Sequence, residues 1–120
     1  MSYGFLLDEH LPRWWPVAIR RRQPALDVRR VGGPGAPPLQ SPDPILLDWC
    51  EANGFLLLTN NRRSMPGHLA GHLAAGRHVP GIIQVEASHD VKDLADTFAL
   101  IAGASLLHEY QDRILSIYSL

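Results

Sequence analysis

Two short apolar runs in this chain end abruptly in side chains that carry oxygen ligands. Phe5–Leu7 is followed by Asp8 and Glu9, and the run 55–58 is followed by Thr-Asn-Asn at 59–61. Runs that are apolar at every position are typical of parallel strands buried on both faces. The carboxyl ends of parallel strands meet at one edge of a sheet, where open α/β sheets bind their ligands. The two polar ends therefore predict one shared site.

Strand-like and helix-like segments alternate along the chain. Apolar runs bounded by proline and glycine predict strands over residues 3–8, 27–31, 55–59, 81–85 and 113–119. Apolar spacing predicts helices over 12–22, from 43 or 44 to 53, over 66–75 and over 89–102 (capped by Ser88), with a helical turn near 106–110. This alternation predicts a three-layer α/β/α domain over 1–120, with a mainly parallel sheet of about five strands in the order 2-1-3-4-5.

Residues 32–44 are rich in proline and glycine, which predicts a surface loop between the second strand and the second helix. The glycines of this loop do not have the strand-to-helix spacing that cradles phosphate groups, so a dinucleotide site or a P-loop is disfavoured. At its end the loop brings Asp43 to the start of the second helix. In the predicted strand order, this position adjoins the crevice between the first and third strands.

The bulk composition limits the class of protein. A chain of 120 residues with 46% hydrophobic content can bury a core, and a formal charge of −1 gives no long-range attraction to nucleic acid. The single Cys50 excludes an internal disulfide, which favours a reducing compartment. We see no leader peptide and no apolar stretch near the roughly 18 residues that span a bilayer. The expectation is a soluble cytoplasmic domain without a membrane anchor.

Four side chains are candidates for a metal site: Asp8, Glu9, Asp43 and Asn61. Two carboxylates about 4 Å apart repel by about 1 kcal/mol in water and by about 4 kcal/mol at an effective dielectric constant near 20. A crevice that gathers them needs a counter-charge, and Mg²⁺ or Mn²⁺ suits oxygen ligands best. A water on such an ion can attack a phosphodiester. The alternative is that Asp8 and Asp43 merely cap the helices that follow them.

Histidine, arginine and tryptophan supply weaker signals. His68 and His72 share a helix face, with His78 nearby, but Leu69 replaces the glutamate of the zinc protease motif, so a solvated or interfacial role is favoured. Arg62 and Arg63 follow the third strand and are expected to contact a phosphate backbone. Further arginines occur at 20–22 and 29–30, and the first group suits a helix end anyway. One member of the pair 14–15, Trp-Trp, must be partly exposed, which suggests a protein partner or base stacking.

Taken in order, these motifs resemble the compact PIN-like domains. The resemblance rests on the opening segment 6–12 (Leu-Leu-Asp-Glu-His-Leu-Pro), on Asp43-Pro-Ile-Leu with Trp49 and Cys50 behind it, on 55–66, on 79–83 and on the closing segment 110–120. It implies a metal-dependent ribonuclease fold, commonly the toxin of a bacterial toxin–antitoxin pair. It also implies that Asp8, Asp43 and the position of Asn61 hold Mg²⁺ or Mn²⁺. This chain departs at two points, with Asn61 in place of the usual Asp and His10 in place of the usual Asn.

Two functional hypotheses follow from the resemblance. In the first, the chain is an endoribonuclease in which Glu9 is an outer or alternative ligand, and Thr59, Arg62, Arg63 and His10 orient the water or bind RNA. In the second, Asn61 marks an inactive PIN-like module that binds a small antitoxin-like partner or RNA. A homodimer is a further expectation. A receiver-type regulator fits less well, because it needs a lysine at the end of strand five and none is present there.

Overall fold

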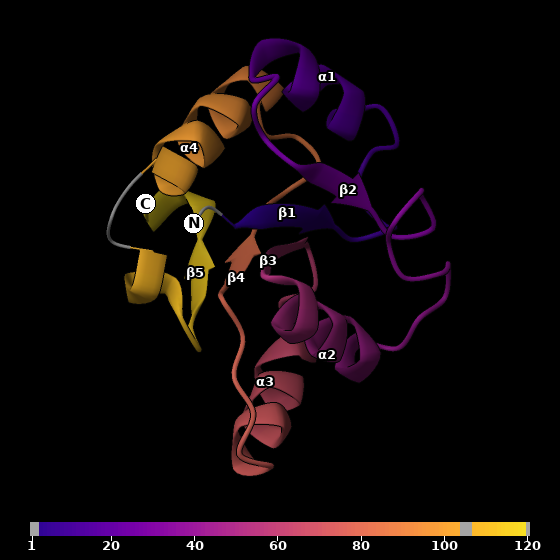
Figure 1. The fold of residues 1–120 in the computed structure, drawn as a ribbon, viewed down its shortest axis with the longest axis vertical. Helices are drawn as coiled ribbons and strands as arrows, with labels where there is room; N and C mark the ends of the chain where they lie inside the picture. The colour runs from indigo at the N-terminus through magenta and orange to yellow at the C-terminus, as the bar shows by residue number, and fades with distance from the viewer. Residues whose placement is uncertain (1–2, 104–106, 120) are drawn as a thin grey trace.

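The computed structural model describes residues 3–103 and 107–119, and Figure 1 shows their arrangement. Five parallel strands form one sheet in the order β2-β1-β3-β4-β5. The predicted α/β class, the parallel sheet and the strand order are confirmed. The strands are β1 (Gly4–Leu7), β2 (Val28–Arg30), β3 (Phe55–Thr59), β4 (Ile82–Gln84) and β5 (Ile114–Ser116).

Helices cover both faces of the sheet. The helices are α1 (Trp15–Arg22), α2 (Asp43–Asn53), α3 (Met65–Ala74) and α4 (Val91–Gly103), and two short 3-10 turns, η1 (Leu107–Tyr110) and η2 (Ile117–Ser119), flank β5. The core divides into two apolar clusters, one between the sheet and α1 with α4, the other between the sheet and α2 with α3. Within β1, Phe5 and Leu7 join the first cluster while Leu6 joins the second, as the alternation of a strand requires. None of the helices in the described part of the chain has the length and apolarity to cross a membrane.

Most element boundaries differ from the sequence-based expectation by one residue, and three differ by more. Helix α1 begins at Trp15 rather than at Pro12, because Pro16 has no N–H to bond back to residue 12 and is tolerated only in a first turn. Helix α4 begins at Val91, and the cap is Asp90 rather than Ser88, since the Asp90 carboxylate accepts the Lys92 N–H at 2.8 Å. The last strand ends at Ser116, where η2 takes over, and position 106 of the predicted helical turn lies outside the described residues.

The end of α2 fixes the start of β3. Gly54 adopts φ +74°, the left-handed conformation that favours glycine, and its N–H bonds to the Cys50 carbonyl. The chain then enters β3, which lies between β1 and β4. Because β1 has β2 on one side and β3 on the other, the connections that follow β1 and β2 leave in opposite directions along the sheet. The carboxyl ends of β1 and β3 therefore lie at the topological switch point, the place where such folds bind ligands.

Candidate functional site

The carboxyl ends of β1 and β3 hold a buried carboxylate against a buried hydroxyl. Asp8 is 4% exposed, and its backbone N–H continues the sheet by donating to Leu58 at 2.9 Å. The hydroxyl of Thr59, which is fully buried, donates to Asp8 Oδ2 at 3.0 Å. Helix α1 has no side-chain cap, so Asp8 does not play the capping role that was the alternative interpretation. Its carboxylate belongs to the sheet edge instead.

Asn61 extends this arrangement away from the strand end. Its backbone N–H donates to the Thr59 hydroxyl at 3.0 Å, and its side-chain amide donates to Asp43 Oδ2 at 2.9 Å and to Ser64 Oγ at 2.7 Å. Its side-chain oxygen accepts the backbone N–H groups of Arg63 and Ser64 at 3.2 and 3.1 Å. Backbone N–H groups can only donate, so they fix which end of the amide faces Asp43. The end that faces Asp43 is the NH₂ group.

Asp43 enters the site from a different segment. It is the first residue of α2, where a negative charge is favoured by the helix dipole, and its side chain is 20% exposed. The residue before it, Pro42, is the N-cap, and α2 has no side-chain cap bond, so the capping alternative is not observed for Asp43 either. Its Oδ2 lies 3.7 Å from His68 Nε2 on α3. A continuous chain of three hydrogen bonds thus runs from Asp8 through Thr59 and Asn61 to Asp43.

These residues fit a divalent cation only in part. The buried Asp8 carboxylate accepts a neutral hydroxyl and, among the described residues, has no cationic side chain within ion-pair distance, a situation that a metal ion relieves. Mg²⁺ commonly takes one or two carboxylates and keeps several waters, which suits Asp8 and Asp43. However, the NH₂ group of Asn61 points toward Asp43, and its side-chain oxygen accepts the backbone N–H of Arg63 instead. No group of three or more His, Cys, Asp or Glu side chains gathers as a metal site in the described part of the chain.

The other predicted site residues make contacts outside this chain of hydrogen bonds. The Glu9 carboxylate accepts the Gln40 N–H at 2.7 Å, which turns it toward the loop before α2. Arg62 forms an exposed ion pair with Glu86 at 2.6 Å. Arg63 and His10 are exposed at the surface. The structure therefore brings together Asp8, Thr59, Asn61 and Asp43, and leaves Glu9, His10, Arg62 and Arg63 at the periphery.

Sequence reasoning did not place Ser64 at this site, and it considered His68 only as a partner of His72. Ser64 accepts from the Asn61 amide, and His68 faces Asp43. The signal for Ser64 was its position three residues after an asparagine that follows a strand, a spacing at which an asparagine oxygen commonly accepts backbone N–H groups. His68 lies four residues further, on the first turn of α3, so it projects toward the same edge.

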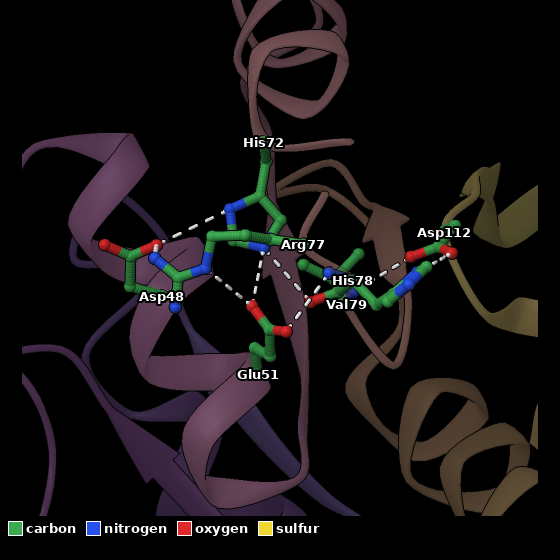
Figure 2. Close-up of polar contacts among 7 residues, drawn as sticks. All are labelled: Asp48, Glu51, His72, Arg77, His78, Val79 and Asp112. Carbon is green, nitrogen blue, oxygen red and sulfur yellow. Dashed lines mark hydrogen bonds and ion pairs between the residues drawn. The ribbon is translucent and has the colours of Figure 1, made fainter. Parts of the chain in front are cut away.

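A second polar cluster joins α2, α3 and the segment before β4 (Figure 2). Arg77 donates to Asp48 and, at 3.0 Å, to Glu51. His72, whose side chain is only 4% exposed, places Nε2 3.1 Å from Glu51 Oε1 and 3.0 Å from the His78 carbonyl. His72 and His68 therefore face different carboxylates. The cluster ties the chain after α3 to the flank of α2.

The same cluster reaches the turn before β5 through His78 and Asp112. His78 Nδ1 donates to Asp112 Oδ2 at 2.7 Å, and this hydrogen bond to a carboxylate raises the pKa of His78. Burial acts to raise the pKa of Asp112, but the hydrogen bonds from His78 and from the Val79 N–H outweigh it and lower that pKa. The pair is thus favoured in its charged form. It lies before β4 and β5, at the opposite edge of the sheet from Asp8.

No family model, no curated protein and no solved structure matches this chain.

Proposed function

We propose that this chain is a PIN-like, metal-dependent endoribonuclease of the cytoplasm, acting as the toxin of a toxin–antitoxin pair. The observation that supports it is the meeting of two carboxylates from distant segments, Asp8 after β1 and Asp43 on α2, through the bridge of Thr59 and Asn61. The bridge lies at the sheet edge where α/β folds of this strand order bind ligands. The resemblance of the motifs to PIN-like domains points to the same activity.

Each residue of the bridge has a role in this proposal. Asp8 and Asp43 would hold Mg²⁺ or Mn²⁺, which supplies an acidified water and offsets charge on the phosphate oxygens. Thr59 fixes the rotamer of Asp8 by donating to one of its oxygens, which leaves the other oxygen for a cation. Asn61 holds the Asp43 carboxylate at 2.9 Å. Arg62, Arg63 and His10, exposed near this edge, contact the RNA strand.

The activity is tested with purified protein, single-stranded RNA and added Mn²⁺ or Mg²⁺. We expect cleavage that EDTA stops and that Asp8→Asn reduces by at least about 100-fold, because one ligand charge is removed while the shape is kept. Glu109→Gln is the matched control, since Glu109 is an exposed carboxylate on η1, far along the chain from the site. Cleavage that persists in EDTA, or that Asp8→Asn leaves unchanged, would refute the proposal.

A second candidate, a module that binds without catalysis, is favoured by the orientation of Asn61. Its NH₂ group already satisfies Asp43, so this half of the site is paired without a cation. Trp14 on the surface before α1 is 58% exposed and Tyr118 is 61% exposed, which suits an antitoxin-like partner or a second copy of the chain. Asn61→Asp separates the two candidates. A gain of cleavage favours the enzyme, and no gain, together with no calorimetric Mn²⁺ binding, favours the module.

A further inference from the structure

The arginines of the first half of the chain fall into two groups by their partners. Arg22 forms a forked pair with Asp96, at 2.9 and 3.0 Å, and Arg29 forms one with Asp27, at 3.1 Å for both contacts. The charges of these two guanidinium groups are therefore matched by carboxylates. Arg13, Arg20, Arg21 and Arg30 form no ion pair with any carboxylate among the described residues.

Three of these four, Arg13, Arg20 and Arg30, line one groove between α1 and β2, which lie next to each other in Figure 1. Arg29 lines the same groove. The groove has a volume of about 400 Å³, and none of the described residues that line it is a carboxylate. Arg20 donates to the Val28 carbonyl at 2.7 Å, and Arg30 donates to the Val31 and Glu9 carbonyls at 3.2 and 2.6 Å. Arg30 Nε is buried and has no hydrogen-bond partner within the part of the chain that the structure describes. Three guanidinium charges without a carboxylate partner among the described residues thus share this concave surface with Arg29, whose charge is matched by Asp27.

One end of this groove adjoins the candidate site. Arg30 is the last residue of β2 and pairs in register with Leu7, the last residue of β1. Its guanidinium contacts the carbonyl of Glu9, the residue after Asp8. Arg13 lies in the connection between β1 and α1, which leaves the sheet at the carboxyl end of β1, where Asp8 lies. The arginines therefore continue from the Asp8 edge along the outer strand of the sheet.

The guanidinium groups of the groove favour an anionic partner, and one that does not have to form backbone hydrogen bonds with β2. An acidic peptide would dock most readily as an added strand on the edge of β2, but the Val28 carbonyl already accepts from Arg20, and the Arg30 carbonyl accepts from Gly33 at 2.8 Å. Phosphate groups require only guanidinium donors, and arginine presents them in a fork. A phosphodiester chain also offers several anions in a row, which matches arginines spaced along one groove.

We propose that the groove lined by Arg13, Arg20 and Arg30 binds the phosphodiester backbone of the single strand whose scissile bond lies at Asp8 and Asp43. This inference rests on the proposed nuclease function, which places the scissile bond at Asp8 and Asp43. The binding itself needs no metal. Single-stranded RNA and DNA share this backbone chemistry, and nothing in the groove reads the 2′-hydroxyl. The groove therefore supplies affinity and positioning, while the bridge at Asp8 supplies the chemistry.

The test measures binding without turnover, in EDTA, by fluorescence anisotropy of a labelled single-stranded RNA, with a DNA strand of equal length and an acidic peptide as further arms. The variants are Arg13→Gln alone and Arg13→Gln/Arg20→Gln. The matched control, Arg21→Gln/Arg113→Gln, removes the same charge from two exposed arginines outside the groove. Arg21 lines a different depression, beside Arg22 and Lys92.

For each phosphate that is no longer neutralised by an arginine, the affinity for a single strand at about 0.1 M salt should fall about 5-fold, so the double variant should bind about 25-fold more weakly. The slope of log K against log salt should become shallower by about 1.4 for the double variant and about 0.7 for Arg13→Gln. The control double variant should retain most of the affinity. Arg13→Gln keeps the test valid if removal of the Arg20–Val28 bond destabilises the fold.

Equal losses of affinity in the groove variant and in the control variant would overturn the proposal, as would stronger binding of the acidic peptide than of either strand. Equal binding of RNA and DNA supports it, because the groove is predicted to read the backbone alone. If the protein binds single strands through the groove but never cleaves them, the groove proposal stands and the nuclease proposal fails. The failure of one proposal is thus distinguishable from the failure of the other.

Discussion

Asn61→Asp would place a carboxylate oxygen where the amide nitrogen now lies, 2.9 Å from Asp43 Oδ2. Two unit charges at that separation repel by about 1.4 kcal/mol in water and by about 6 kcal/mol at an effective dielectric constant near 20. Because the Asp43 side chain is 20% exposed, the environment lies between these limits. We expect a loss of about 2–4 kcal/mol in the free energy of unfolding at neutral pH without metal.

The loss is measured by urea unfolding in EDTA and again with Mn²⁺. An ion held by the new carboxylate, Asp8 and Asp43 binds the folded state alone, so Mn²⁺ at about 100 times its Kd should return about 2.7 kcal/mol. The double variant Asn61→Asp/Asp43→Asn is the control, because it moves the amide donor to α2 and restores a donor–acceptor pair. This control should regain most of the stability in EDTA and gain little from Mn²⁺.

Two outcomes would refute the reasoning at different points. If Asn61→Asp is as stable as the unaltered chain in EDTA, the side chains of Asn61 and Asp43 are not adjacent in solution. If it is destabilised as expected but Mn²⁺ restores nothing, the two carboxylates are adjacent but do not hold an ion together. The second outcome would favour the binding module over the nuclease.

Two further predictions follow from the buried and charged pairs. Thr59→Val should cost about 2–4 kcal/mol of unfolding free energy in urea, because it removes the donor to the buried Asp8 carboxylate and the acceptor of a backbone N–H, whereas Thr59→Ser should keep most of it. The raised pKa of His78 means that its pair with Asp112 stabilises the fold fully below the ordinary histidine value of 6.5 and loses this contribution as pH rises through the raised value. The melting temperature should therefore fall more between pH 6 and pH 9 for the unaltered chain than for His78→Gln, and parallel curves would contradict the assignment.

Much of the fold could be predicted because its signals are local. Strand β1, and β3 up to Thr59, are apolar since both faces of the sheet are covered, and Gly54 ends α2 because it supplies a positive φ. The boundaries that were wrong depend on competition between neighbouring residues. Asp90 displaces Ser88 as the cap of α4, and the chain after Ser116 turns into a 3-10 helix rather than extending the strand.

The candidate site was predictable in its position but not in its internal contacts. Strand ends and the start of α2 indicated that Asp8, Thr59, Asn61 and Asp43 meet, and the structure joins them by hydrogen bonds. Glu9 is bonded to Gln40 in the long loop, and Arg62 is paired with Glu86 after β4. No local sequence pattern predicts either contact. Which arginines are matched by carboxylates is likewise a property of the folded surface.

The orientation of one amide connects the two functional candidates. With a carboxylate at position 61, the edge would carry three negative charges beside Thr59, and only a cation would stabilise it. With Asn61, the NH₂ group satisfies the Asp43 carboxylate from within the chain, so the site can remain folded without metal. Binding of an anion by the arginine groove, as proposed above, requires no metal in either case, because the groove carries positive charges. If both proposals hold, strand binding and strand cleavage are separable, and changes at Asn61 should alter cleavage while leaving groove-dependent binding in EDTA intact.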